Sequence, residues 1–363
     1  MSKSVEYDKI RIDFVLKREE KMLFKFKKNS VKKKVIEQLN NVTFNYQLAE
    51  NYQLEKQAAI TMNNSYYFCA HSIDKKQSLI MRLENRVDYS EVWFYYSEGN
   101  NKYFLEQTNF TANPPLKIYN EEGIWYIRFS GVVKKNQKDQ VRCTIDAQFS
   151  SSKDPIDYLT QTLPERFAIA IAQENWNTED YKALDNKDYV SYEQVGTLTG
   201  KMLLEGQHSN FNIPCFRNHS YGKKDWNYLN NHLKLVALNE NGSFSFAMNS
   251  NPKLSLFETG NYSYLNDNYK VFSAKYERAT LLRGTSPENL NIYIELDNKN
   301  KISIHIKKLD EIIYYFQEGD YMIVEGIAEF LIEGRSYRGI IETGFNKDRM
   351  RWFNNKNIEK IRG

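Results

Sequence analysis

The sequence is poor in cysteine and contains no long apolar run. Its three cysteines, Cys69, Cys143 and Cys215, are widely separated among 363 residues, so no disulfide framework or CxxC metal motif is present. No apolar stretch approaches the length of a membrane-spanning helix. The charged residues from Lys3 to Arg11 leave no hydrophobic region for a signal peptide. These absences predict a cytoplasmic protein without an integral membrane segment.

Sequence motifs for nucleotide or metal chemistry are also missing. There is no Walker loop, GxSxG elbow or dinucleotide fingerprint. His208, Cys215, His219 and His232 do not have the spacing of a zinc site, so we expect neither a metal nor a cofactor. The net charge of +4 is too small to indicate nucleic-acid binding.

The positive charge is concentrated near the N-terminus, with six lysines in residues 25–34. Such a run is most often a solvated helix face, and contact with an anionic partner or membrane surface is the alternative. Apolar residues such as Val15, Val35 and Leu39 suggest amphipathic helical pieces. We therefore assign residues 1–57 to a basic helical extension and leave its role open.

Aromatic residues are abundant, with 26 Tyr and 21 Phe, and these types favour half-buried β-strands. From residue 58 onward, short runs that alternate apolar and polar residues are separated by turn residues, the pattern of a sandwich or closed barrel. The pattern stops in mid-chain, where Leu163-Pro164 precedes a helix-like run. The sequence thus predicts an all-β protein with a first β domain at 58–150, a helical linker at 151–188 and a second β domain at 189–363.

One short segment concentrates reactive side chains. Arg217, His219 and Tyr221 alternate with smaller residues, so they share one face if the segment is a strand. Asp225 and Trp226 follow within reach of that face. Burying such groups costs free energy unless they satisfy one another. The segment is therefore either an ion-paired structural clasp or a proton-transfer site.

His219 is the first candidate for proton transfer, because an imidazole exchanges protons near neutral pH. Asp225 would be a general acid if an apolar pocket raised its pKa, whereas an ion pair with Arg217 would keep it ionised. Glu193 and Glu342 lie in apolar or aromatic contexts. Each of them would pair with Arg217 or face a cavity, although strand glutamates usually face solvent.

The segment Phe216–Trp226 resembles a family signature. It is similar to the Arg-Asp-His-Ser-Trp/Phe-Gly-x-Arg-Asp-Trp pattern of the two-domain lipocalin-like (calycin) proteins that include carotenoid 1,2-hydratases and AttH-like proteins. Its form is most similar to the module ahead of the nucleotide-binding region in animal phosphoenolpyruvate-synthase-like proteins. Asn218, Tyr221 and Lys224 depart from the pattern. Because Asn218 replaces a carboxylate, a catalytic role at that position does not transfer.

Two further stretches resemble the same family. Tyr192-Glu193-Gln194 leads into a glycine-bounded strand, and Gly339–Glu342 is similar to a closing Gly-x-x-Glu strand. The resemblance covers roughly residues 60–345. It implies two consecutive lipocalin-like antiparallel β-barrels or sandwiches, each a fold that can enclose a small apolar ligand.

The resemblance also implies an activity. The family includes cofactor-independent hydratases and cyclases, which suggests a lyase-, cyclase- or isomerase-type enzyme acting on an isoprenoid- or polyketide-like substrate. His219 or Asp225 would donate a proton, and Tyr221 and Trp226 would stabilise cationic character through their π faces. Trp226 is also a candidate for packing on Arg217 at the barrel floor. A non-catalytic carrier of hydrophobic ligands or an interaction scaffold is the alternative.

The position of the ligand follows from the composition. A hydrophobic content of 41% has to fill two cores, so we expect a ligand cavity in only one half. We place it in the second half, beside His219, Asp225 and Glu342. The first barrel would then be filled by its own side chains, such as Trp93 and Trp125.

Overall fold

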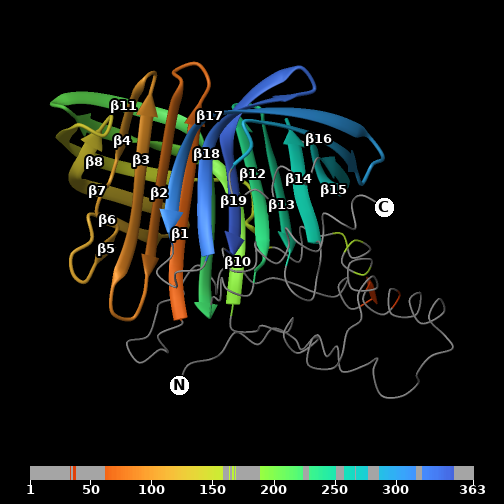
Figure 1. Ribbon diagram of the computed structural model, residues 1–363, viewed down its shortest axis with the longest axis horizontal. Coiled ribbons are helices and arrows are strands. Elements are labelled where there is room, and N and C mark those ends of the chain that lie inside the picture. The colour runs from red at the N-terminus through yellow and green to blue at the C-terminus, as the bar shows by residue number, and fades with distance from the viewer. Residues whose placement is uncertain are drawn as a thin grey trace.

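The computed structural model describes residues 62–157, 189–223, 229–250, 257–265, 267–276, 286–315 and 321–346, with a few isolated positions elsewhere. The described residues form nineteen β-strands, sixteen of which make up two closed eight-stranded antiparallel barrels (Figure 1). This architecture confirms the predicted all-β fold of two lipocalin-like barrels. Within the described part of the chain, no helix combines the length and apolar content needed to cross a membrane.

Eight strands close the first barrel. In order around the barrel they are β1 (Met62–Ser72), β2 (Gln77–Asn85), β3 (Ser90–Glu98), β4 (Asn101–Phe104), β7 (Ile124–Lys135), β8 (Asp139–Ser150), β10 (Tyr189–Leu204) and β11 (Gln207–Lys223). Pairing between β11 and β1 completes the ring. The short strands β5 (Asn109–Phe110), β6 (Leu116–Glu121) and β9 (Ile156–Asp157) pair with β3, β7 and β10.

The strand pairing differs from the domain boundaries expected from the sequence. The sequence analysis begins the second β domain at residue 189 and so assigns β10 and β11 to it. In the structure β10 pairs with β8, and β11 pairs with β1. Both strands therefore belong to the first barrel, because they fill the gap that β8 and β1 would otherwise leave. The predicted linker interrupts one barrel instead of separating two.

Two of the predicted segments fall largely outside the described residues. Of the linker at 151–188, the structure describes 151–157 and three later positions. Of the extension at 1–57, it describes Lys33, Ile36 and Glu37, which are helical.

The second barrel is an up-and-down meander. Its strands are β12 (Asn231–Asn239), β13 (Gly242–Ser250), β14 (Phe257–Tyr264), β15 (Asp267–Tyr276), β16 (Asn289–Leu296), β17 (Lys301–Tyr315), β18 (Tyr321–Ile332) and β19 (Arg335–Asn346). Each strand pairs with the next along the chain, and β19 pairs with β12 to close the ring.

Three hairpins use a Glu-Gly pair as a two-residue turn. Both residues of Glu122-Gly123, Glu205-Gly206 and Glu333-Gly334 have a positive φ, as a type I′ turn requires. This turn matches the twist of the flanking strands and lets the residues on either side pair directly. The local sequence therefore sets the register of these hairpins.

Each barrel is filled by its own apolar side chains. In the first barrel, Phe94 stacks on Phe129 with ring centroids 4.1 Å apart, and Trp125 is buried beside them. This packing agrees with the predicted filling of the first barrel, except at Trp93. Trp93 lies on the outer face of β3 and packs against Tyr321 of the second barrel, because strand neighbours point to opposite faces.

The two barrels meet through their outer faces, with β1 beside β19 (Figure 1). The contact buries an apolar cluster from both barrels: Tyr67, Cys69, Ile80, Tyr95, Phe216, Val236, Leu238, Ile327 and Ile340. We call this contact the inter-barrel interface. Successive side chains of a strand point to opposite faces of the sheet. Each interface strand therefore presents alternate residues to the core of its own barrel and to the other barrel.

Candidate functional site

Arg217, His219 and Tyr221 point into the first barrel from one face of β11, as the sequence alternation predicts. All three are buried. Arg217 and His219 contact Trp125, which belongs to the barrel core. Asp225, which the sequence adds to this group, and Trp226 beside it lie outside the described residues.

His219 is held by hydrogen bonds on both ring nitrogens. Asn64 Oδ1 can only accept, so Nε2 of His219 carries the proton and donates it over 2.7 Å. Nδ1 then accepts from the Tyr192 hydroxyl at 2.5 Å. Burial, followed by the charge of Arg217, lowers the pKa of His219 well below its usual value. A neutral imidazole with both nitrogens engaged is a poor proton donor at neutral pH.

Arg217 is bound by neutral and aromatic groups. Its Nε donates to Gln194 Oε1 at 2.8 Å. Its guanidinium carbon lies 4.8 Å from the ring centroid of Trp125, 5.4 Å from that of Tyr192 and 5.6 Å from that of Phe149, within cation–π range. Trp125 thus makes an arginine contact of the kind the sequence analysis assigns to Trp226. Within the described residues, the group around His219 and Arg217 is held by hydrogen bonds and ring contacts.

Glu193 and Glu342 lie on the other side of this barrel wall, in the inter-barrel interface. Glu193 is on the opposite face of β10 from Gln194 and accepts a hydrogen bond from Lys234 Nζ at 2.6 Å. Glu342 Oε1 is 2.9 Å from His232 Nε2. The predicted site residues are therefore divided between the inside of one barrel and the interface of both.

Glu325 is a buried acid that the sequence analysis does not identify. It is 0% exposed on β18, where it is the register partner of Glu342 on β19. Its Oε1 accepts a hydrogen bond from Tyr67 of β1 at 2.8 Å. Its Oε2 is buried and has no hydrogen-bond partner in the described part of the structure. Burial, followed by the charge of Glu342, raises the pKa of Glu325 well above its usual value.

Glu342 takes the opposite charge state. Burial alone would raise its pKa, but the hydrogen bond from His232 and the charges of Lys234 and Arg82 lower it below its usual value. Two neighbouring carboxyls cannot both ionise without strong repulsion. The surroundings resolve this conflict by keeping the proton on Glu325 and the negative charge on Glu342. We call these two residues the carboxyl pair, an arrangement that separates an acid from a base.

His232 links Glu342 to a tyrosine. Its Nδ1 is 2.6 Å from the Tyr321 hydroxyl, and the two rings are nearly parallel with centroids 5.7 Å apart. Gly344 makes room for both rings, because a Cβ built there would lie 2.2 Å from the His232 ring and 2.7 Å from that of Tyr321. The hydrogen bonds run from Tyr321 through His232 to the carboxyl pair.

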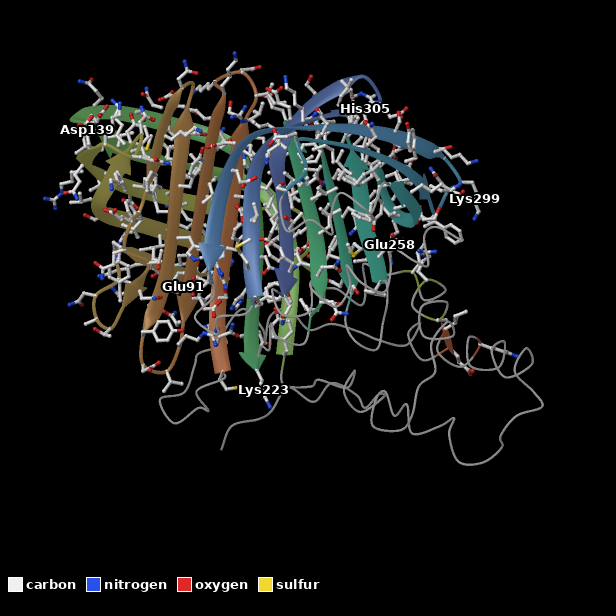
Figure 2. All side chains as sticks on the ribbon, in the orientation of Figure 1. Glu91, Asp139, Lys223, Glu258, Lys299 and His305 are labelled. Atoms are coloured by element: carbon white, nitrogen blue, oxygen red, sulfur yellow. The ribbon has the colours of Figure 1, made fainter. Side chains whose placement is uncertain are left out.

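Further charges line the same interface on the side of the first barrel. Trp93 Nε1 donates to Glu91 at 2.5 Å, and the Arg82 guanidinium lies 4.2 Å over the Trp93 ring. Arg82 also pairs with the buried Glu84. Figure 2 labels Glu91 on the first barrel and Lys223 where β11 ends at the lower edge of the molecule. Among the described residues, no cluster of His, Cys, Asp and Glu is arranged to hold a metal ion.

The sequence carries a signal for Glu325. It stands inside the apolar run Tyr321–Ala328 of a strand, where an acidic residue is almost never fully buried unless it is paired. His232 and Lys234 follow the same alternation on β12. Their convergence depends on how two closed barrels dock, which strand periodicity does not encode.

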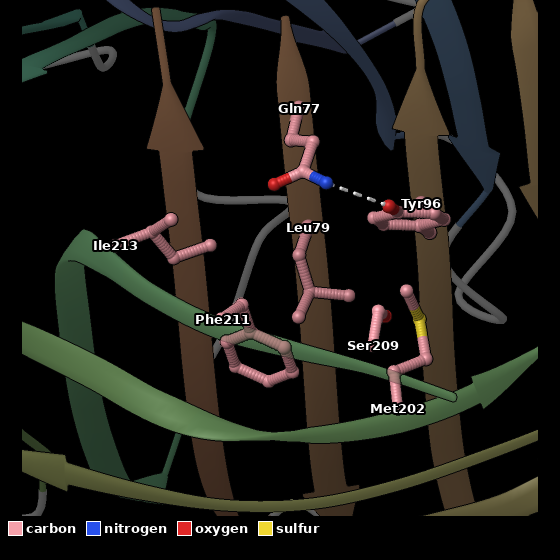
Figure 3. Close-up of a pocket in the computed structure, with 7 residues that line it drawn as sticks. All are labelled: Gln77, Leu79, Tyr96, Met202, Ser209, Phe211 and Ile213. Atoms are coloured by element: carbon pink, nitrogen blue, oxygen red, sulfur yellow. Dashed lines mark hydrogen bonds between the residues drawn. The ribbon is translucent and has the colours of Figure 1, made fainter. Parts of the chain in front are cut away.

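A pocket opens in the first barrel, away from these groups (Figure 3). It is lined by Gln77, Leu79, Tyr96, Met202, Ser209, Phe211 and Ile213, and spans about 260 Å³ including space open to solvent. The Gln77 amide donates to the Tyr96 hydroxyl at 3.2 Å. This pocket lies in the first half, whereas the sequence analysis expects a cavity in the second. The centre of a water molecule can occupy only about 10 Å³ of it, which is room for about one water.

Comparison with known proteins places the chain in a family. A family model described as a domain of unknown function (DUF7064) matches residues 49–347, which is most of the 363-residue chain. The chain belongs to the DUF7064 family. The matched region spans both barrels, so the carboxyl pair and the His219 group lie inside the DUF7064 domain. Comparison with curated proteins gave no match.

Comparison with solved structures gave several matches. An AttH-like protein from Nitrosomonas europaea matches with a TM-score of 0.51 and 10% identity, over 82% of this chain and 98% of that one. Kievitone hydratase from Nectria haematococca gives 0.44 and 10%, over 81% and 96%. CghA with Sch210972 gives 0.46 and 8%, over 79% and 89%. At these identities the likeness concerns the two-barrel fold alone, and the closeness to the animal phosphoenolpyruvate-synthase-like module stays a prediction.

Proposed function

We propose that this DUF7064 protein is an enzyme that transfers a proton from Glu325 to a hydrophobic, unsaturated substrate. The reaction is an acid-assisted hydration, cyclisation or isomerisation at the inter-barrel interface. The observation that carries the proposal is the carboxyl pair: a fully buried glutamic acid whose pKa is raised, directly opposite a carboxylate whose pKa is lowered. The sequence analysis gives the proton-donor role to His219 or Asp225; His219 is neutral and engaged at both nitrogens, and Asp225 lies outside the described residues, so we assign the role to Glu325.

The chemistry of Glu325 suits this role. A carboxyl whose pKa is raised by burial holds its proton at a higher pH than an exposed one and can release it to a reacting group. The apolar interface residues Ile80, Val236 and Ile327 belong to one cluster with Tyr67, which touches Glu325. These side chains are packed between the barrels, so a substrate of the isoprenoid- or polyketide-like class that the family resemblance implies has to displace them to reach Glu325.

A non-catalytic carrier or scaffold is the second candidate. It is favoured by the complete burial of Glu325 and by its bond to Tyr67, which joins the two barrels. In that case the carboxyl pair fixes the docking of the barrels and performs no chemistry.

Deuterium incorporation separates the two functions. The protein is incubated in D2O with a panel of apolar alkenes, polyenes and enones, and the products are weighed by mass spectrometry. The wild-type protein should add one deuterium to at least one compound. Glu325→Gln should reduce the rate by about 100-fold or more, the usual contribution of a general acid.

Glu258→Gln is the matched control. Glu258 is a buried glutamate of the second barrel that pairs with Arg166, so its variant should retain the reaction. Incorporation that persists in Glu325→Gln, or a panel that yields no deuterated product, would refute the enzymatic proposal and leave the carrier.

A further inference from the structure

We infer that Tyr321 is a second catalytic residue, the proton acceptor, and that His232 and Glu342 position it for this role. The inference rests on the proposed function and deepens it, because it names the class of reaction and the shape of the substrate. The donor, Glu325, and the acceptor, Tyr321, lie at different points along β18. One extended substrate molecule would therefore gain a proton at one position and lose a proton at another.

The order of Glu342, His232 and Tyr321 defines the direction of proton transfer. The ionised Glu342 faces Nε2 of His232 at 2.9 Å and favours a proton on that nitrogen. Nδ1 is then a lone pair 2.6 Å from the Tyr321 hydroxyl, which donates to it. A carboxylate, an imidazole and a hydroxyl in this order make the hydroxyl oxygen a better proton acceptor, as in other triads.

The carboxyl pair connects the acceptor to the donor. Glu342 touches His232 on one side and is the register partner of Glu325 on the other. A proton taken up by His232 therefore has a return route through Glu342 to Glu325. After each turnover this route restores the charges of Glu325 and Glu342, and exchange with solvent resets the proton positions before the next substrate binds.

The spacing along β18 selects the reaction. Tyr321 and Glu325 are four residues apart on one face of the strand, which separates their Cα atoms by roughly 13 Å at about 3.3 Å per residue. Ile323 lies between them on the same face and packs with Tyr321 and Trp93. Groups this far apart cannot act together on the two carbons of one double bond. They can act on the two ends of an extended, unsaturated chain that takes the place of Ile323, a side chain that is 1% exposed between the barrels.

The step balances without a co-reactant. The O–H bond of Glu325 breaks and a C–H bond forms at one end of the substrate, leaving a carbocation. Ring closure or a double-bond shift moves the positive charge along the chain. A C–H bond then breaks at the far end, and its proton passes to Tyr321 Oη while the phenolic proton moves to His232 Nδ1. Substrate and product are isomers, so the class is a proton-initiated cyclisation or isomerisation.

The test uses linear polyenes with separated double bonds in D2O. The wild-type protein should form an isomer that carries one deuterium and no added water. Tyr321→Phe removes the acceptor and keeps the donor. We therefore expect the isomer to fall by about 100-fold and the cation to be captured by water, which gives a deuterated alcohol. Glu325→Gln should give neither product.

Matched variants separate a chemical role from a structural one. Tyr337→Phe alters a tyrosine buried inside the second barrel and should leave the isomer unchanged. Gly344→Ala keeps every reactive atom but displaces the His232 and Tyr321 rings, so it should shift the products toward the alcohol. Nitrogen NMR of the wild-type protein should show His232 protonated on Nε2, and Glu342→Gln should weaken that preference.

The outcomes are distinguishable from those of the first proposal. If Glu325→Gln abolishes the reaction but Tyr321→Phe matches the wild-type protein, the acceptor is wrong and the donor stands. A wild-type product that is itself the water adduct would also overturn the inference. If Glu325→Gln has no effect, or no polyene reacts, both proposals fail.

Discussion

His71 and His219 are buried histidines that face different environments at the residue scale. His71 lies on β1, bonded to Ser78, and burial followed by the charge of Arg338 lowers its pKa to about 3. His219 lies inside the first barrel, and its pKa is also lowered well below the usual value. Both are therefore neutral in the folded protein at pH values where an exposed histidine is charged.

These two histidines should make the protein sensitive to mild acid. The unfolded chain binds more protons below a pH of about 6.5, so the stability that the two neutral histidines contribute is fully present above that pH. This contribution is lost as the pH falls, and for His71 the loss continues down to a pH of about 3. Each histidine should contribute a slope of up to about 1.4 kcal/mol per pH unit. Denaturant unfolding between pH 7 and 5 should show a shallower slope in His71→Asn and in His219→Asn.

The double variant provides the check on this slope. The two histidines lie in different environments, so their contributions should add, and the His71→Asn/His219→Asn slope should be the shallowest. If both single variants keep the wild-type slope, neither histidine is neutral for the reason given.

Part of the site could be predicted residue by residue. Alternation along one strand is local, and it correctly placed Arg217, His219 and Tyr221 on one face. The bond between Tyr67 and Glu325 joins residues 258 positions apart. It depends on the docking of two closed sheets, so no local pattern in the sequence could indicate it.

At the scale of the strands, two glycines of β19 let other groups approach the backbone. A Cβ built on Gly339 would lie 1.7 Å from the Val236 carbonyl oxygen of β12, which explains the glycine in the Gly-x-x-Glu pattern that the sequence analysis noted. Gly344 serves the rings of His232 and Tyr321 in the same way. These two glycines therefore allow β12 and the rings of His232 and Tyr321 to pack directly against the backbone of β19.

Gly339→Ala should weaken the pairing of β19 with β12. The new methyl group meets backbone and not a flexible side chain, so we expect a loss of about 1–3 kcal/mol in the free energy of unfolding. Gly131→Ala is the control, because its nearest atoms, at 3.0 and 3.3 Å, belong to the side chains of Phe129 and Pro115. Chemical denaturation should give a clearly smaller loss for the control, and equal losses would contradict the backbone contact.

Strands were predictable because a closed antiparallel barrel alternates apolar and polar residues and marks its turns. The barrel to which each strand belongs was not predictable. The helix-like run after Leu163-Pro164 resembles a domain boundary in the sequence, whereas β10 and β11 beyond it return to pair with β8 and β1. Long-range pairing leaves no trace in local composition.

For the whole molecule, the charges in the inter-barrel interface bind the barrels to each other. Lys234 of β12 pairs with Glu193 of β10 at 2.6 Å, and its Nζ lies 4.8 Å from the ring centroid of Phe216. Glu193 is mostly buried. Burying an ion pair costs desolvation free energy for both charges. Each charge therefore destabilises the fold strongly when its partner is removed.

Lys234→Met should therefore destabilise the protein by about 3–5 kcal/mol, since Glu193 loses its ammonium partner in a buried setting. The double variant Lys234→Met/Glu193→Leu should recover most of that loss, because it removes both charges. Thermal and denaturant unfolding of the four proteins in this cycle measure the coupling. A double variant that is as unstable as the sum of the single ones would show that the pair is not coupled.

The first barrel takes its last two strands from beyond an interruption in the chain, and this affects how the polypeptide could be divided. A cut in residues 158–188 would not release two independent barrels. The shorter fragment would be a sheet with unpaired edges at β1 and β8, and the longer one a whole barrel carrying the β10–β11 hairpin. That hairpin has the hydrogen-bonding pattern both edges need. The two fragments are thus complementary halves, and each would supply what the other lacks for noncovalent reassembly.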